Sequence, residues 1–330
     1  MPFRDIIGHT RLTSLLARAV ARESVPPTLL LAGPGGVGKW RVARALAAAL
    51  NCPAPVGGDA CGVCRSCDRI ARDVHVDVVP VEPDDSGKIK LETVRDALKD
   101  CGYRPFEGKR RIVLLRDADA LLEAAQNALL KVLEEPPPAT VFVLTSAAPD
   151  ALLRTVRSRT MRLTFGRLTM GEVEHLLVRD HGREPAAAQR LAGLADGSVG
   201  TALALGSSDM AETREAALRL LGAAAERDLA GRLAVAKAVV GEKKDERSRQ
   251  EMKAVLHLAS SLARDLSLLH AGSDRRLLAH GDLGDRLDRL ARTLPAPAAR
   301  KAFVTVDRAL SALERNAGVK LVTEWAASEL

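Results

Sequence analysis

The sequence has few aromatic residues and no long hydrophobic run. Only 2% of its 330 residues are aromatic: two Trp, one Tyr and five Phe. Because bases stack on aromatic rings, we expect any nucleic-acid partner to be held mainly through its phosphate backbone, without sequence-specific readout. A membrane-spanning helix needs about 20 mostly apolar residues, and no segment of the sequence approaches that length. We therefore expect no membrane partner.

The first ten residues, MPFRDIIGHT, also lack the apolar segment of a secretory signal, because Arg4 and Asp5 interrupt it. We expect a cytoplasmic protein. Disulfides are disfavoured in that compartment, so the five cysteines call for another explanation.

Charge and length narrow the alternatives further. The 49 Lys and Arg residues exceed the 42 Asp and Glu residues, which gives a net charge of +7 and an isoelectric point of about 9.4. This excess suits a phosphate-bearing partner. A chain of this length favours two or three domains rather than one.

The hydrophobic pattern predicts an α/β domain followed by helices. Apolar runs at 28–32, 76–81, 112–115 and 141–144 alternate with helical patterns, which is typical of a parallel sheet with crossover helices. One helix is predicted by the spacing of apolar residues from Leu122 to Leu133, and three prolines end it.

Strand signals end near Phe165, and the rest of the chain has helical periodicity. We predict three domains: an α/β domain at 1–166, a small all-α domain at 167–206 and a larger all-α domain at 207–330.

Residues 33–40 read GPGGVGKW, with Gly33, Gly38 and Lys39 at the spacing of a phosphate-binding loop. Glycines let backbone N–H groups surround phosphate oxygens, and the lysine reaches the terminal phosphates. Trp40, however, stands where such loops carry a Ser or Thr that binds Mg²⁺. Because an indole has no oxygen, nucleotide binding by this loop is in doubt.

A second departure occurs in the run IVLLRDAD. Arg116 stands where an acidic magnesium ligand would follow the strand, and Asp117 stands where a catalytic glutamate is usual. Two defects in one metal site indicate a phosphate-loop fold that has lost its own hydrolytic chemistry.

Four of the five cysteines, Cys52, Cys61, Cys64 and Cys67, form C-x8-C-x2-C-x2-C. Four thiolates at this spacing can close a tetrahedron around Zn²⁺ in a structural site. An iron–sulfur cluster is the alternative, because sets of four cysteines also hold such clusters. We interpret Cys101, far away in the sequence, as an ordinary thiol.

Taken together, these residues resemble the AAA+ clamp-loader subunits of bacterial DNA polymerase III. The resemblance covers the whole chain and is carried by five segments: FRDIIGH at 3–9, GPGGVGK at 33–39, NALLKVLEEPP at 127–137, the Ser-Arg-Thr run at 158–160 and ERNAGVKL at 314–321. The cysteine module at 52–67 is similar to the zinc module of that family. The resemblance implies that the first domain, 1–166, is a degenerate AAA+ domain. It also implies that 167–206 is a lid and that 207–330 is a collar that serves oligomerisation.

The family has a motor branch (gamma/tau-type) that hydrolyses ATP and a delta-prime branch that does not. Trp40, Arg116 and Gly200, which replaces a sensor arginine, all favour resemblance to the delta-prime branch. The resemblance further implies that Arg159, next to Ser158, is an arginine finger inserted into the ATP site of a neighbouring motor subunit. Such fingers accelerate hydrolysis by about 10³- to 10⁵-fold.

The function implied by the resemblance is that of an accessory subunit without catalysis of its own. It would assist ATP-driven loading of the sliding clamp onto primed DNA. Its expected partners are the motor (gamma/tau) subunits, the delta subunit, the clamp and the backbone of primer-template DNA.

Two alternatives remain open from the sequence. In the first, Lys39 and Asp117 suffice for catalysis and the chain is an active motor subunit. In the second, the cysteine module is a DNA-binding finger carried by a relic domain. Only Arg65 and Arg69 supply cations near the cysteines, which is little for a nucleic-acid surface.

Overall fold

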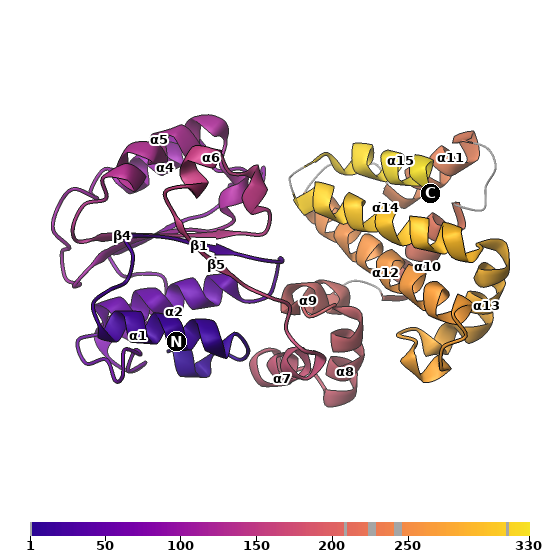
Figure 1. The fold of residues 1–330 in the computed structure, drawn as a ribbon, viewed down its shortest axis with the longest axis horizontal. Helices are drawn as coiled ribbons and strands as arrows, with labels where there is room; N and C mark the ends of the chain where they lie inside the picture. The colour runs from indigo at the N-terminus through magenta and orange to yellow at the C-terminus, as the bar shows by residue number, and fades with distance from the viewer. Residues whose placement is uncertain (1, 208–209, 224–228, 241–245, 315–316) are drawn as a thin grey trace. The chain divides into compact units, whose positions relative to one another are not determined.

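The computed structural model describes residues 2–207, 210–223, 229–240, 246–314 and 317–330. It divides the chain into two compact units, Met1–Glu172 and Val173–Leu330, and Figure 1 traces both. In the described parts of the chain, no helix combines the length and apolarity needed to cross a membrane.

The first unit contains a five-stranded parallel sheet in the order β2-β3-β4-β1-β5. Its strands are β1 (Thr28–Ala32), β2 (Val78–Val81), β3 (Arg111–Leu115), β4 (Thr140–Ser146) and β5 (Met161–Thr164). Its helices are α1 (Thr10–Ala21), α2 (Lys39–Asn51), α3 (Arg65–Ala71), α4 (Leu91–Leu98), α5 (Glu123–Glu134) and α6 (Arg154–Arg157), with 3-10 turns η1 (Phe3–Asp5), η2 (Ala118–Ala120) and η3 (Pro149–Ala151). The expected α/β fold with a parallel sheet is confirmed.

Helices cover both faces of this sheet (Figure 1), with α1 and α2 on one side and α4, α5 and α6 on the other. Successive side chains of a strand point to opposite faces. In β1, Leu29 and Leu31 therefore join the core under α1 and α2, while Leu30 joins the core under α4 and α5. Burial on both faces explains why the central strands appear in the sequence as continuous apolar runs.

The edge strand β5 was not among the expected strands. Only Leu163 of its four residues is buried. A strand this short and this exposed produces no apolar run, so the sequence carries no signal for it.

In the described residues of the second unit, all regular elements are helical, as the sequence predicts. They are α7 (Met170–His181), α8 (Pro185–Leu194), α9 (Val199–Ser207), α10 (Met210–Gly222), α11 (Leu229–Val240), α12 (Glu246–His270), η5 (Arg275–Leu277), η6 (Gly281–Leu283), α13 (Gly284–Thr293), α14 (Ala296–Glu314) and α15 (Val319–Glu329). The long helix α12 packs against α10, α13 and α14. The division into a lid at 167–206 and a collar at 207–330 stays a prediction. Of the ERNAGVKL segment before α15, Arg315 and Asn316 lie outside the described residues.

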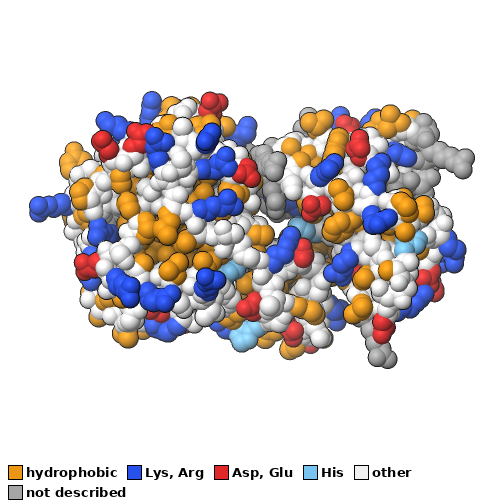
Figure 2. All heavy atoms as spheres, viewed as in Figure 1, with side chains coloured by type: hydrophobic (Ala, Val, Ile, Leu, Met, Phe, Trp, Pro, Cys, Tyr) orange, Lys and Arg blue, Asp and Glu red, His pale blue; other side chains and the backbone are white. Residues whose placement is uncertain are grey.

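Basic side chains are spread over the drawn faces of both units rather than gathered in one stripe (Figure 2). An apolar area occupies the middle of the drawn face of the first unit. On this face, the net charge of the chain does not by itself mark a binding surface.

A buried histidine makes the second unit sensitive to acid. The His280 side chain lies near Ser261, with 3.2 Å between Nε2 and Oγ, and its backbone N–H donates to the Asp265 carboxylate at 2.8 Å. Burial lowers the pKa of His280 to about 4, a change that Arg214 reinforces and Asp265 opposes.

We expect the second unit to lose about 3 kcal/mol of stability as the pH falls from 6.5 to 4. In this range the unfolded chain takes up a proton on His280, at its ordinary pKa near 6.5, and the folded chain does not. Urea unfolding followed by Trp325 fluorescence in a Trp40→Phe background measures this loss. His280→Gln removes the titrating group, so the acid sensitivity should shrink; an equal sensitivity would assign it to other groups.

Candidate functional site

The phosphate-loop sequence lies between β1 and α2, as expected. The first backbone N–H groups of a helix have no partner within the helix and suit an anion. Gly38 precedes α2 with φ +101°, and a Cβ there would meet nothing within 4 Å. Gly33 has a different role, because a Cβ on it would lie 2.4 Å from the carbonyl oxygen of Phe165. A side chain is thus excluded by lack of space at Gly33 and disfavoured by the left-handed backbone at Gly38.

The lysine of this loop is turned into the loop itself. Lys39 is 5% exposed, and its Nζ donates to the carbonyl oxygens of Gly33 and Pro34, both at 2.7 Å. These carbonyls fix the shape of the loop around a buried cation. For Lys39 to contact a phosphate, it must exchange these hydrogen bonds for the phosphate oxygens.

The two residues that depart from the magnesium-binding pattern contact each other. The guanidinium carbon of Arg116 lies 5.8 Å from the ring centroid of Trp40, within the range of a cation–π interaction. The half-buried Trp40 also packs against the core on the α1 and α2 side of the sheet. Two changes that look independent in the sequence therefore form one structural unit.

Arg116 also engages the carboxylates beside it. Its Nη1 lies 3.4 Å from Glu82 Oε1, and its Nε lies 3.7 Å from Asp117 Oδ2. At a position where a metal ion would need negative ligands, the chain has a fixed positive charge that neutralises the acidic groups. This arrangement opposes the binding of a divalent cation.

Arg159 is anchored at the other end of β1. The hydroxyl of Thr28, the first residue of β1, donates to the carbonyl oxygen of Arg159 at 2.6 Å. The phosphate loop follows the last residue of β1, Ala32, and four steps along a strand span about 13 Å. Arg159 thus lies at the amino end of β1, and the phosphate loop lies at its carboxyl end.

The Arg159 side chain is held by its own chain. Its Nη2 lies 2.5 Å from Glu134 Oε1, and its Nη1 donates to Thr155 O at 3.0 Å and to Ser158 Oγ at 3.4 Å. Its side chain is 33% exposed. Glu134 belongs to the NALLKVLEEPP run, and its pairing with Arg159 has no signal in the sequence because the two residues meet only in the folded chain.

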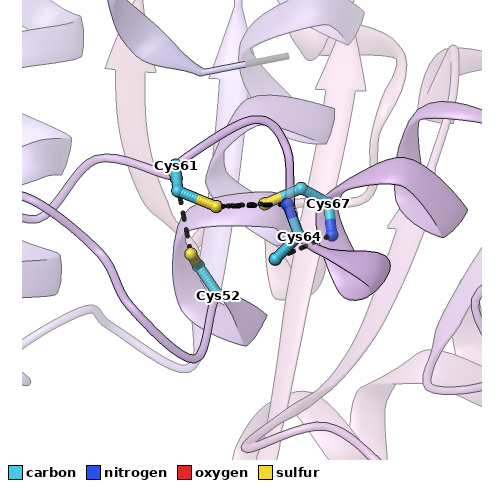
Figure 3. A group of neighbouring side chains, drawn as sticks. All are labelled: Cys52, Cys61, Cys64 and Cys67. Carbon is cyan, nitrogen blue, oxygen red and sulfur yellow. Dashed lines mark hydrogen bonds between the residues drawn. The ribbon is translucent and has the colours of Figure 1, made fainter.

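The four cysteines lie side by side, at the end of α2, in the following loop and at the start of α3 (Figure 3). Their sulfur atoms all lie within 4.8 Å of one another. Four thiolates around one Zn²⁺ at about 2.3 Å would have sulfur atoms about 3.8 Å apart. The cluster thus fits a single metal ion, and Cys101 takes no part in it: that thiol is buried and donates to Ala97 O.

Backbone N–H groups stabilise the thiolates of this cluster. The N–H groups of Cys61, Cys64 and Cys67 donate to the sulfur atoms of Cys52, Cys61 and Cys64, respectively, at 3.3–3.4 Å. Hydrogen bonds from the backbone at Val63 and Cys64 lower the pKa of Cys61 to about 6. Burial raises the pKa of Cys67 to about 12, so this thiol is neutral at pH 7 unless a cation stabilises its anion.

The cysteine module is attached to the rest of the first unit through two arginines. Arg4 donates to the carbonyl oxygens of Ala60 and Cys61 at 2.9 and 2.8 Å. Arg44 of α2 donates to Ala71 O at 2.7 Å and forms an ion pair with Asp73. The module therefore braces the N-terminal segment against the helix that follows the phosphate loop.

The chain is similar in sequence to subunits of DNA polymerase III. The family model described as DNA polymerase III, delta subunit, matches residues 8–169. The chain is 34% identical over 208 residues to DNA polymerase III subunit tau of Escherichia coli strain K12, which covers 62% of this chain and 32% of that protein. It is 37% identical over 187 residues to subunit delta' of Pseudomonas aeruginosa, which covers 56% of this chain and 57% of that protein.

The match thus spans about a third of the length of the Escherichia coli tau subunit, at 32%. Among solved structures, a gamma subunit-related protein of DNA polymerase III from Thermotoga maritima covers 92% of this chain and 98% of its own, with 16% identity and a TM-score of 0.40.

Proposed function

We propose that the chain is the non-hydrolysing, delta-prime subunit of a bacterial clamp loader. The match of residues 8–169 to the family model described as DNA polymerase III, delta subunit, supports this proposal. In this function it assists ATP-driven loading of a sliding clamp onto primed DNA. It catalyses no reaction by itself.

The observation that carries this proposal is the contact between Trp40 and Arg116. ATP hydrolysis in phosphate-loop proteins needs a metal ion that neutralises charge on the transferred phosphoryl group. Arg116 lies 5.8 Å from the Trp40 ring and close to Glu82 and Asp117. Restoring a magnesium site would require both side chains to leave, so ATP binding with Mg²⁺ is disfavoured in this subunit.

We further propose that Arg159 is an arginine finger for a neighbouring motor subunit. Its backbone is hydrogen-bonded to the first residue of β1, whereas its own phosphate loop follows the last residue of β1, about 13 Å further along the strand. An arginine in that position supports action in trans. Ser158 and Glu134, both in contact with the guanidinium, hold it in one orientation before a partner binds.

For the cysteine cluster we propose a structural Zn²⁺. Four protein ligands leave no open coordination position, which is typical of structural rather than catalytic zinc. The mutual sulfur distances, all within 4.8 Å, support a single ion. An iron–sulfur cluster would instead place at least two irons and two sulfides between the same thiolates.

The partners and location follow from this function and are part of the proposal. They are the motor (gamma/tau) subunits, the delta subunit, the sliding clamp and the backbone of primer-template DNA, all in the cytoplasm. The second unit provides the helical surface for assembly with the other subunits.

The second candidate is an active motor subunit. It is favoured by the 34% identity to the tau subunit over 208 residues and by the intact Gly33, Gly38 and Lys39. In that case, Asp117 would perform the acid–base chemistry.

Turnover of ATP by the purified chain distinguishes the two candidates. We expect no magnesium-dependent phosphate release from the chain alone, and stimulation when it is added to motor and delta subunits with clamp and primed DNA. We expect the lack of turnover to result from the loss of the magnesium site. The double variant Trp40→Thr, Arg116→Asp should therefore gain magnesium-dependent nucleotide binding. Robust turnover by the unmodified chain would establish the motor function instead.

A further inference from the structure

The most exposed aromatic residues of the protein lie together on one loop. Tyr103, the only tyrosine, is 72% exposed, and Phe106 is 84% exposed. Both belong to the segment between α4 and β3. Full exposure of a phenylalanine forgoes the stabilisation that its burial would provide, about 1.5–3 kcal/mol, so its position calls for a partner outside the chain.

Cations alternate with these rings. Arg104 and Lys109 are exposed, and within the described residues neither side chain has an ion-pair partner. Glu107, the acidic residue between them, is bound to Arg69, with 2.6 Å between Oε1 and Nη1. The loop therefore presents two rings and two uncompensated positive charges within seven residues.

Two buried side chains, Asp77 and Asn51, hold the backbone of this loop in place. Asp77, which is 0% exposed, accepts backbone N–H bonds from Phe106, Glu107 and Gly108 at 2.7–2.8 Å. Asn51 accepts from the N–H of Arg110 and donates to its carbonyl oxygen, both at 2.9 Å. A loop that is held in this way loses little conformational entropy when a ligand binds.

We propose that the loop at 103–109 binds single-stranded nucleic acid. Tyr103 and Phe106 would stack on unpaired bases, and Arg104 and Lys109 would contact the adjacent phosphates. Rings that alternate with unpaired cations match a strand in which bases alternate with phosphates. The core of a protein-docking surface is depleted of lysine, whereas this short loop carries the exposed Lys109 together with its two rings.

This inference rests on the proposed function in one respect: the template beyond a primer end is single-stranded DNA. It names a contact surface on the first unit that is separate from the phosphate loop. That loop lies at the carboxyl edge of the sheet, after β1, whereas the loop at 103–109 precedes β3 and lies at the amino edge.

Binding of a fluorescein-labelled 20-nucleotide oligothymidylate to the full chain tests the proposal by fluorescence anisotropy. Stacking is worth about 1–3 kcal/mol per base, so the double variant Tyr103→Ala, Phe106→Ala should bind about 30-fold or more weakly, with an unchanged salt dependence. The double variant Arg104→Ala, Lys109→Ala should instead reduce the slope of log K against log salt by about 1.4. Phe303→Ala, a ring that is 39% exposed in the second unit, is the matched control and should change neither.

Three results would overturn the proposal. The first is no binding of the oligonucleotide by the unmodified chain, and the second is equal binding by the ring variant. The third is a loop variant, either Tyr103→Ala, Phe106→Ala or Arg104→Ala, Lys109→Ala, that binds the oligonucleotide as before but no longer assembles with the other clamp-loader subunits. That result would identify the loop as a protein-docking surface. Assembly of all variants with those subunits, measured by size-exclusion chromatography, tests the proposed function separately.

Discussion

Arg159→Ala should slow ATP hydrolysis at one site of the reconstituted clamp loader by about 10³-fold or more, because arginine fingers supply about 10³ to 10⁵ in rate. The guanidinium would neutralise charge that develops on the phosphoryl group in the neighbouring subunit. Rapid mixing of the loader with ATP measures the effect. The first-turnover burst of phosphate release should lose the amplitude of one site.

Loss of folding does not explain such a result. The ion pair between Arg159 and Glu134 is partly exposed, with side chains 33% and 50% accessible, and such pairs contribute about 1 kcal/mol or less. The variant should therefore assemble normally. Arg162→Ala, an exposed arginine on the adjacent strand β5, is the matched control and should retain the full burst. A full burst from Arg159→Ala as well would remove the finger assignment.

Removal of the metal from the cysteine module is expected to have the largest effect on structure. Zinc binding by small Cys/His modules is worth about 10–16 kcal/mol, and without it the neutral thiol of Cys67 and the thiolate of Cys61 no longer hold the loop closed. Hydrogen exchange at residues 52–72, with and without a chelator, measures the loosening. Because Arg4 attaches to Ala60 O and Cys61 O, exchange at residues 3–6 should rise in parallel.

The serine variants refine this experiment. Cys61→Ser should bind the metal much more weakly and should reproduce the effect of the chelator. Cys101→Ser changes a cysteine outside the cluster and should keep one zinc per chain with unchanged exchange at 52–67. Metal analysis of the purified protein gives the decisive number: iron, or less than one zinc per chain, would contradict the site as proposed.

Much of the first unit could be predicted from local sequence. The run at 28–32 is β1 as the structure has it, because a strand buried on both faces needs consecutive apolar residues. The phosphate loop and the four cysteines could also be predicted from the sequence, because the spacing of their residues along the chain reflects ligand geometry. The short edge strand β5 was missed because one buried residue, Leu163, produces no pattern.

Contacts between distant segments could not be predicted in the same way. Trp40 and Arg116 are 76 positions apart, and sequence reasoning treated them as separate defects in a metal site. The parallel sheet brings the end of β3 next to the start of α2, and the guanidinium then lies 5.8 Å from the indole ring. The pairing of Arg159 with Glu134 depends in the same way on how α5 and α6 pack on one face of the sheet.

The sequence by itself determined the α/β class of the first unit, the helical second unit, the phosphate loop with its departures and a four-cysteine cluster. These features depend on hydrophobic period and on local spacing, which are properties of short segments. Only the tertiary structure decided which charges neutralise each other, at which end of the strands Arg159 lies and which two of the eight aromatic residues are the most exposed. Those properties depend on burial, and burial is set by the packing of segments that lie far apart in the chain.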